Sequence, residues 1–127
     1  MKGDDIAERM LQFGVRIIKL AEALPKRFTA KHIALQVLRS GTSAGANYEE
    51  ARGAESRADF VHKLGVSWKE TRESRYWLQL IQRAALVKPV LLAGLVQESE
   101  ELSKILARSL RTLKRPPDSD GPPPAGT

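Results

Sequence analysis

Apolar residues near the start of the chain recur at alternating steps of four and three positions. They are Ile6, Met10, Phe13, Ile17, Leu20 and Leu24. This spacing places the side chains on one narrow stripe of an α-helix, as at positions a and d of a heptad. The acidic pair Asp4–Asp5 suits a helix N-terminus and Pro25 would end the helix. We therefore predict a helix over residues 4–24 that buries this one stripe.

Start and stop signals predict three more helices between the first one and residue 114. Thr29 is the expected N-cap of the second helix, and Gly53 follows its end. Ser56, with Asp59 three residues later, approximates a capping box that begins the third helix. Pro89 suits the first turn of the fourth helix. The four predicted helices span residues 4–24, 29–52, 56–87 and 89–114.

The pattern of these segments predicts an all-α, up-down-up-down antiparallel four-helix bundle. The connections are short, which makes sequential helices antiparallel neighbours, and no segment alternates with the period of two that marks a strand. A chain of 127 residues supports one domain with a modest core, and we assign residues 1–114 to it. Residues 115–127 hold five of the seven prolines and no large aliphatic residue, so we expect a disordered proline-rich tail.

Two glycines four residues apart, Gly41 and Gly45, interrupt the second predicted helix. Glycine inside a helix costs about 0.5–1 kcal/mol relative to alanine. The close approach of a neighbouring helix is the expected reason, and we expect the third helix to be that neighbour. Dimerisation within a membrane fails as an explanation, because the same segment carries Arg39, Glu49 and Glu50.

A polar stripe runs beside these glycines. Its members are Gln36, Arg39, Ser43, Asn47 and Glu50. The stripe is either a solvated face or a half-buried hydrogen-bond network. In an antiparallel pair of helices Arg39 comes within reach of Glu70 or Glu73. We predict that Arg39 pairs with one of these two carboxylates and so fixes the register of the second and third helices.

The third predicted helix carries more apolar surface than one inward face can bury. Trp68, Tyr76 and Trp77 fall outside that face, and aromatic side chains are rarely left in water without cause. They indicate a subunit interface or part of the core. A nucleic-acid surface is the alternative, since basic side chains neutralise phosphates and aromatic rings stack on bases. The basic residues that would carry it are Lys69, Arg72, Arg75 and Arg83.

The charge balance does not decide between these interpretations for a single copy. The chain has 21 basic and 15 acidic residues, a net charge of +6, but no basic run exceeds two residues. An oligomer would gather the charge of several copies on one surface, and attraction of polyanions would then become physically reasonable.

Residues that carry chemistry are few. The chain has no cysteine, which removes disulfides, thiolate zinc sites and cysteine nucleophiles. His32 and His62 lie on different predicted helices and do not supply the paired Glu-x-x-His motifs of a di-iron bundle. Ser40 and Ser43 have no histidine at helical reach to act as a base. We therefore expect a non-enzyme with no catalytic residue, no metal and no cofactor.

No segment is apolar enough to span a bilayer. The longest apolar run, residues 90–96, has seven residues, far fewer than the roughly 18 that a spanning helix needs. The first residues, MKGDDIAERM, are too acidic for a secretory leader. We expect a cytoplasmic protein with no membrane partner.

Two blocks of the sequence resemble a known family. The first is residues 36–51, with the motif Q-x-x-RSGTSAGANYEEA, and the second combines DFVHKL at 59–64 with WKETRESRYWL at 68–78. Together they resemble the bacterial four-helix bundle family of 23S rRNA intervening-sequence proteins, from about Phe13 to Leu113. Trp68 departs from the family pattern, which favours alanine there.

The resemblance implies a homo-oligomer, typically a pentameric ring of bundles. Some members of the family are encoded inside insertions in large-subunit ribosomal RNA genes. A related family, the accessory proteins of diversity-generating retroelements, forms basic pentamers that work with a reverse transcriptase and its RNA. The expected function is therefore a nucleic-acid-associated accessory protein that binds RNA or DNA and supports a reverse transcriptase or an rRNA element. The alternative is a protein-interaction scaffold with no direct nucleic-acid contact.

Overall fold

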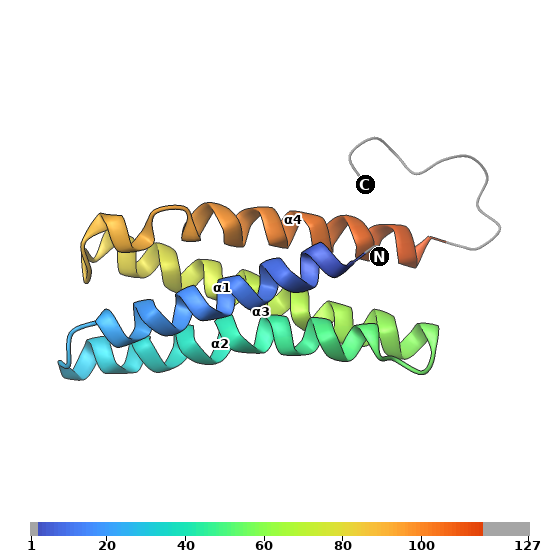
Figure 1. Cartoon of the computed structure of the whole chain (residues 1–127), viewed down its shortest axis with the longest axis horizontal. Coiled ribbons are helices and arrows are strands. Elements are labelled where there is room, and N and C mark those ends of the chain that lie inside the picture. Colours follow the sequence, from blue (N-terminus) through green and yellow to red (C-terminus); the bar gives the residue numbers. More distant parts are fainter. Residues whose placement is uncertain (1–2, 116–127) are drawn as a thin grey trace.

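The structure is a computed structural model that describes residues 3–115. It contains four α-helices and one short 3-10 helix, and it has no strand within this range (Figure 1). The all-α four-helix bundle expected from the sequence is thereby confirmed. The proline-rich tail predicted after residue 114 lies almost wholly outside the described residues. The elements are α1 (Asp4–Ala23), α2 (Phe28–Arg52), α3 (Arg57–Arg83), η1 (Pro89–Leu92) and α4 (Leu95–Lys114).

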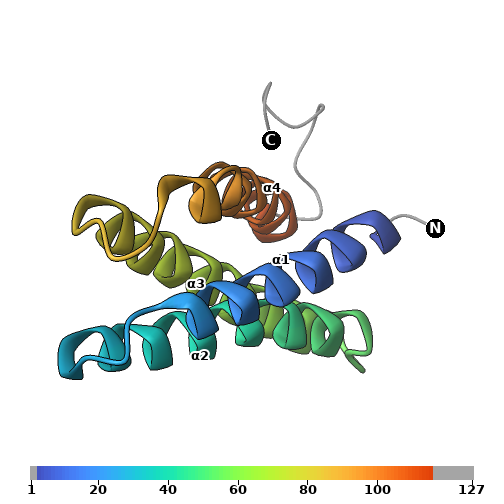
Figure 2. The same cartoon turned by 60° about the vertical axis from the view of Figure 1, so that its left-hand side comes forward.

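Successive helices run in opposite directions along the long axis, so the topology is up-down-up-down (Figure 1). Turning the molecule shows α1 and α4 on the same side of the α2–α3 pair (Figure 2). Arg9 of α1 joins the first and last helices by donating two hydrogen bonds to Glu98 of α4, from Nε to Oε2 at 3.0 Å and from Nη2 to Oε1 at 2.7 Å.

The core lies between the four helices and includes most of the apolar stripe predicted for the first helix. Five of its six members are buried, and Ile6 packs against the core at its edge. The second and third helices contribute small residues as well as large ones to the same core. The buried polar residues are Ser40, Ser67, Thr71, Ser74, Ser99 and Ser103.

Only one of the two predicted N-caps is confirmed by the structure. The Ser56 hydroxyl accepts a hydrogen bond from the backbone N–H of Asp59 at 3.1 Å, which confirms the start of α3. Thr29 is not the N-cap of α2, because the helix begins at Phe28 after Arg27. The backbone N–H of Lys31 already bonds to the carbonyl of Arg27 at 2.8 Å, so the first turn closes before Thr29 can cap it.

The third helix ends at Arg83 and not near residue 87. Ala85 has a φ of 52°, in the left-handed region. The N–H of Leu86 bonds to the carbonyl of Ile81 at 3.2 Å, and the N–H of Ala85 bonds to that of Gln82 at 3.1 Å. These two bonds are those of a Schellman motif, which satisfies the last carbonyls of a helix and turns the chain away.

The fourth predicted helix is two elements. Pro89 starts the 3-10 helix η1, and Gly94 then takes a left-handed φ of 79° before α4 begins at Leu95. A left-handed residue cannot continue a right-handed helix, so the predicted segment 89–114 is interrupted there.

The two glycines of α2 face α1, and the expectation that they face the third helix is wrong. A Cβ on Gly41 would lie 2.8 Å from both Cγ atoms of Ile17, and a Cβ on Gly45 would lie 3.3 Å from Cβ of Met10. Their missing side chains therefore let α1 approach α2 closely. On the α3 side, Ser67 and Ser74 contact α2 through the carbonyl of Ala44 and the hydroxyl of Ser40.

Candidate nucleic-acid interface

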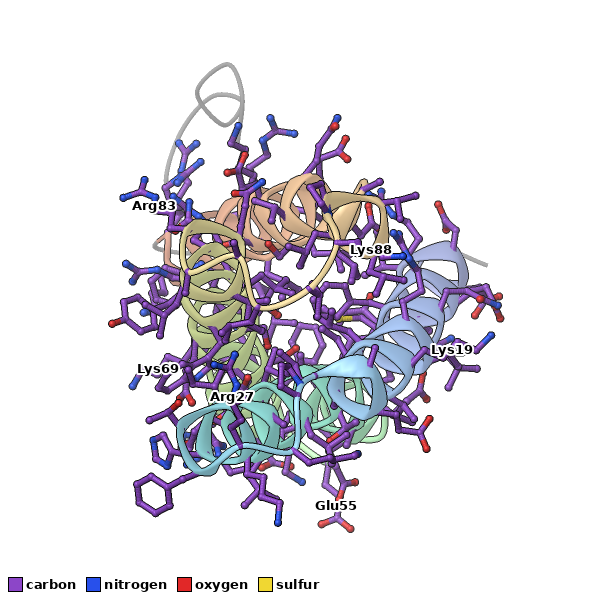
Figure 3. The ribbon with its side chains drawn as sticks, turned by 90° about the vertical axis from the view of Figure 1, so that its left-hand side faces the viewer. Lys19, Arg27, Glu55, Lys69, Arg83 and Lys88 are labelled. Carbon is purple, nitrogen blue, oxygen red and sulfur yellow. The ribbon has the colours of Figure 1, made fainter. Side chains whose placement is uncertain are left out.

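Four side chains form one exposed line along α3. Lys69, Arg72, Tyr76 and Arg83 follow each other at steps of three, four and seven residues, which places them on one side of the helix. All four are exposed, and Tyr76 is 58 % exposed. Lys69 and Arg83 point outward from the α3 side of the bundle (Figure 3). At 1.5 Å per residue the line extends over about 21 Å. We call it the α3 stripe.

The charges of the α3 stripe are available to a ligand. Within residues 3–115, neither Lys69 nor Arg83 forms an ion pair. The Arg72 guanidinium lies 5.0 Å from the ring centroid of Trp68, a cation–π contact that orients the side chain without neutralising it. Three cationic groups on one helix face thus lack a carboxylate partner.

Arg75 was predicted to act with these residues, but its side chain lies beside α4. Its Nε lies 3.9 Å from Oε1 of Glu100 on α4. This side chain lies between α3 and α4, and the carboxylate offsets its charge. The structure therefore brings Lys69, Arg72 and Arg83 together and places Arg75 at the border with the next helix.

The aromatic residues of α3 divide between the core and the surface. Trp68 and Trp77 are partly buried and pack against the core. A position in the core was one of the two expectations for these rings, beside a subunit interface. Tyr76 is exposed, and its ring meets the Trp77 ring edge-on with the centroids 5.1 Å apart. More than half of the Tyr76 surface is open to a stacking partner, which the sequence pattern alone did not show.

Arg39 pairs with both predicted glutamates. Its Nη1 donates to Glu70 at 2.9 Å, and its Nη2 donates to Glu73. The indole Nε1 of Trp77 also donates to Glu73, at 3.0 Å. These hydrogen bonds, led by that from Trp77, hold the pKa of Glu73 below its usual value. The cluster links α2 to α3 and confirms the predicted pairing.

Among residues 3–115, the rest of the predicted polar stripe forms no hydrogen-bond network across the helices. Asn47 donates to the backbone carbonyl of Ser43 within α2, at 2.9 Å, and Glu50 is exposed. The polar contacts beneath it come from serines. The Ser67 hydroxyl donates to the carbonyl of Ala44 at 2.7 Å, and the hydroxyls of Ser74 and Ser40 lie 3.0 Å apart.

A second basic surface on α4 was missed at the level of sequence. Lys104, Arg108 and Arg111 are exposed and lie at helical spacings of four and three. They follow the acidic residues Glu98, Glu100 and Glu101, and the near balance of charge over residues 89–114 concealed their grouping. The signal was present in the spacing, since i, i+4 and i+7 share one helix face.

Neither a cluster of metal-binding side chains nor a helix able to span a membrane is found within the described residues. Within residues 3–115 no group of three or more His, Cys, Asp or Glu side chains could hold a metal ion. In the same range no helix is both long enough and apolar enough to cross a bilayer.

Fold and surface define a small four-helix bundle with a basic helix face. The model of the 23S rRNA-intervening sequence protein family matches residues 3–108, and the chain belongs to this family. It is similar to the crystal structure of a protein of unknown function from the S23 ribosomal protein family of Bacteroides thetaiotaomicron. The two are 37% identical with a TM-score of 0.78, over 87% of this chain and 99% of that chain. No curated protein matches the chain.

Proposed function

We propose that this chain is a non-catalytic accessory protein that binds nucleic acid, RNA or DNA, as a homo-oligomer, in keeping with the pentameric ring implied by its resemblance. The observation that carries the proposal is the α3 stripe, in which Lys69, Arg72 and Arg83 are exposed and have no acidic partner in the part of the chain that the structure describes. The family's name supports it further, because it refers to an intervening sequence of ribosomal RNA.

The chemistry of the stripe suits a nucleic-acid backbone. Cationic side chains displace the counterions condensed on phosphates, and this release supplies most of the affinity of sequence-independent binding. Tyr76 lies between Arg72 and Arg83 on the same face and offers a ring to a base of a single strand. Contacts to phosphates and stacking on a base face depend little on the sequence, so the expected binding tolerates many sequences.

The role that follows is structural support of a nucleic-acid process. A homo-oligomer repeats the stripe once per copy, so that one long RNA can contact several copies at once. We propose that the partner is an RNA together with the enzyme that uses it, such as a reverse transcriptase or the element that carries an rRNA intervening sequence. The chain itself supplies no catalytic residue in this scheme.

A matched pair of double variants tests the proposal. Arg72→Glu with Arg83→Glu reverses two charges of the stripe, and Lys19→Glu with Lys88→Glu makes the same change in net charge away from it. All four side chains are exposed, and all but Arg72 are labelled in Figure 3. Binding of a fluorescent single-stranded RNA, followed by anisotropy, should weaken at least tenfold in the first variant and much less in the second.

Two results would contradict the proposal. Equal loss in the two variants would show that net charge alone attracts the RNA. Absence of binding by the wild-type protein at low salt would favour the alternative, a protein-interaction scaffold without nucleic-acid contact. Co-purification of a protein partner that survives nuclease treatment would then support that alternative.

A further inference from the structure

A second apolar stripe runs along the outer side of α1. Leu11, Val15 and Ile18 follow at steps of four and three, and all three are exposed, Leu11 by 64 %. They line a groove of about 580 Å³ between α1 and α2, whose α2 wall includes Gly45 and Ala46. An unpartnered apolar surface of this kind on a helix indicates an interaction site.

The groove lacks the features of a small-molecule site. Such sites combine apolar walls with a few polar groups that converge on the ligand. Here the charged lining residues are already engaged at the mouth: Arg52 pairs with Asp4 and Glu49, and Glu8 accepts a hydrogen bond from Gln12 at 2.8 Å. The occupant that fits is therefore an apolar protein surface.

This chain carries such a surface at the start of α2. Phe28 is 90 % exposed and Leu35 is 66 % exposed, and seven residues place them on the same side of the helix, two turns apart. Phe28 lies in the first turn of α2, and its near-complete exposure means that its ring projects from the helix. We call these two residues the α2 knob.

The charges around the two surfaces are complementary. Arg27 and Lys31 flank the α2 knob, and both are exposed and form no ion pair within the described residues. The lining of the groove carries three carboxylates and one guanidinium, so an excess of acidic groups remains after Arg52 has paired with Asp4 and Glu49. The acidic groove of one copy therefore attracts the basic surroundings of the knob of another copy. Contacts of groove with groove or of knob with knob would bring like charges together and are disfavoured.

We propose that the α2 knob of one copy docks into the α1–α2 groove of the next. The knob and one wall of the groove belong to α2, a continuous helix, so a chain cannot fill its own groove with its own knob. Each copy therefore offers one free knob and one free groove. Such a head-to-tail contact builds a ring when the rotation closes. The inference rests on the homo-oligomer of the proposed function and names the surfaces that form it.

Two variants that each break one side of the contact test the inference. Leu11→Glu places a charge in the groove, and Phe28→Glu places one on the knob. Both residues are largely exposed, and an acidic residue in the first turn of α2 suits the helix N-terminus. Val90→Glu is the matched control, since Val90 is 73 % exposed but belongs to neither surface. Light scattering should find each interface variant alone as a monomer near 14.1 kDa and the control assembled like the wild type.

Mixing the two interface variants gives the decisive result. The intact groove of the Phe28→Glu copy can accept the intact knob of the Leu11→Glu copy, so the mixture should form a dimer and stop there. Monomers alone in the mixture, or normal assembly of the Phe28→Glu variant, would overturn the inference. Leu35→Glu, as a second knob variant, should behave like Phe28→Glu.

The outcomes separate this inference from the proposed function. A wild-type chain that assembles through these surfaces but binds no RNA leaves the inference standing and overturns the binding. A wild-type chain that is monomeric near 14.1 kDa overturns the inference and the homo-oligomer, whereas RNA binding through the α3 stripe is measured independently.

Discussion

Gly41 sets how closely α1 and α2 approach. A Cβ at this position would lie 2.8 Å from both Cγ atoms of the buried Ile17. We predict that Gly41→Ala lowers the free energy of unfolding by about 1–3 kcal/mol, because overpacking a tight contact costs this much and exceeds the gain in helix propensity. Urea denaturation followed by circular dichroism measures the change.

Gly65 is the matched control on α3. A Cβ there has no heavy atom within 4 Å, so Gly65→Ala should raise the free energy of unfolding by about 0.5–1 kcal/mol through helix propensity alone. A Gly41→Ala protein as stable as the wild type would show that α1 moves away from α2 at little cost in free energy. That result would contradict the claim that Gly41 is needed for the close approach of the two helices.

Glu73 gives the bundle a specific pH dependence. The hydrogen bond from Trp77 and the pairing with Arg39 hold its pKa in the folded protein below the usual 4.5. The stabilisation is therefore complete above about pH 4.5 and is lost as the pH falls through the lowered pKa. Glu73→Gln should cost about 0.5 kcal/mol at pH 7, since the Arg39 side chain is half exposed.

The difference between wild type and Glu73→Gln should shrink as the pH falls below 4.5. Once the pH is below the lowered pKa of Glu73, both forms are uncharged at this position, and Gln can still accept the hydrogen bond from Trp77. Thermal unfolding at a series of pH values measures the difference. A difference that stays constant from pH 7 to pH 3 would mean that the ion pair contributes nothing.

At the scale of the element, the end of α3 depends on a single residue. Ala85 adopts a φ of 52° in a Schellman motif that usually has glycine at this position. An L-residue with a Cβ pays roughly 1–2 kcal/mol for the left-handed region. Ala85→Gly should therefore stabilise the protein by about 1 kcal/mol in chemical denaturation. A destabilised variant would show that the Cβ of Ala85 makes contacts that outweigh its strain.

Element boundaries were predictable where a local signal sets them. Ser56 begins α3 as predicted because an N-cap needs only one hydroxyl and the N–H three residues later. The end of α3 was not predictable in this way, since alanine gives no sign that it will adopt a left-handed φ. The break before α4 had a sign in Gly94, but Pro89 suggested that the helix had already begun.

Pairing between helices was predictable for long charged side chains and not for small ones. Arg39 reaches two glutamates whose positions follow from the register of an antiparallel pair. The partner of Gly41 depends instead on how α1 crosses α2, which the pattern of one helix does not determine. The second apolar stripe of α1, which begins at Leu11, was not predicted, although its spacing is visible in the sequence.

At the scale of the molecule, the surface divides by chemistry. The α3 stripe is basic with one exposed aromatic ring, whereas the α1–α2 groove is apolar with an acidic mouth. The α3 stripe shares no residue with the groove or with the α2 knob. Assembly and binding can therefore each be removed by substitution while the other is measured.

The most direct test of nucleic-acid binding is the salt dependence of RNA affinity. The slope of log K against log [salt] counts the phosphate contacts, at about 0.7 per contact for a single strand. Anisotropy measures this slope for the wild type and for the Arg72→Glu, Arg83→Glu double variant, from low to physiological salt. We predict that the slope of the variant is shallower by at least about 1.4, because two phosphate contacts are lost. Parallel slopes for the two proteins would contradict a phosphate-binding role for the α3 stripe.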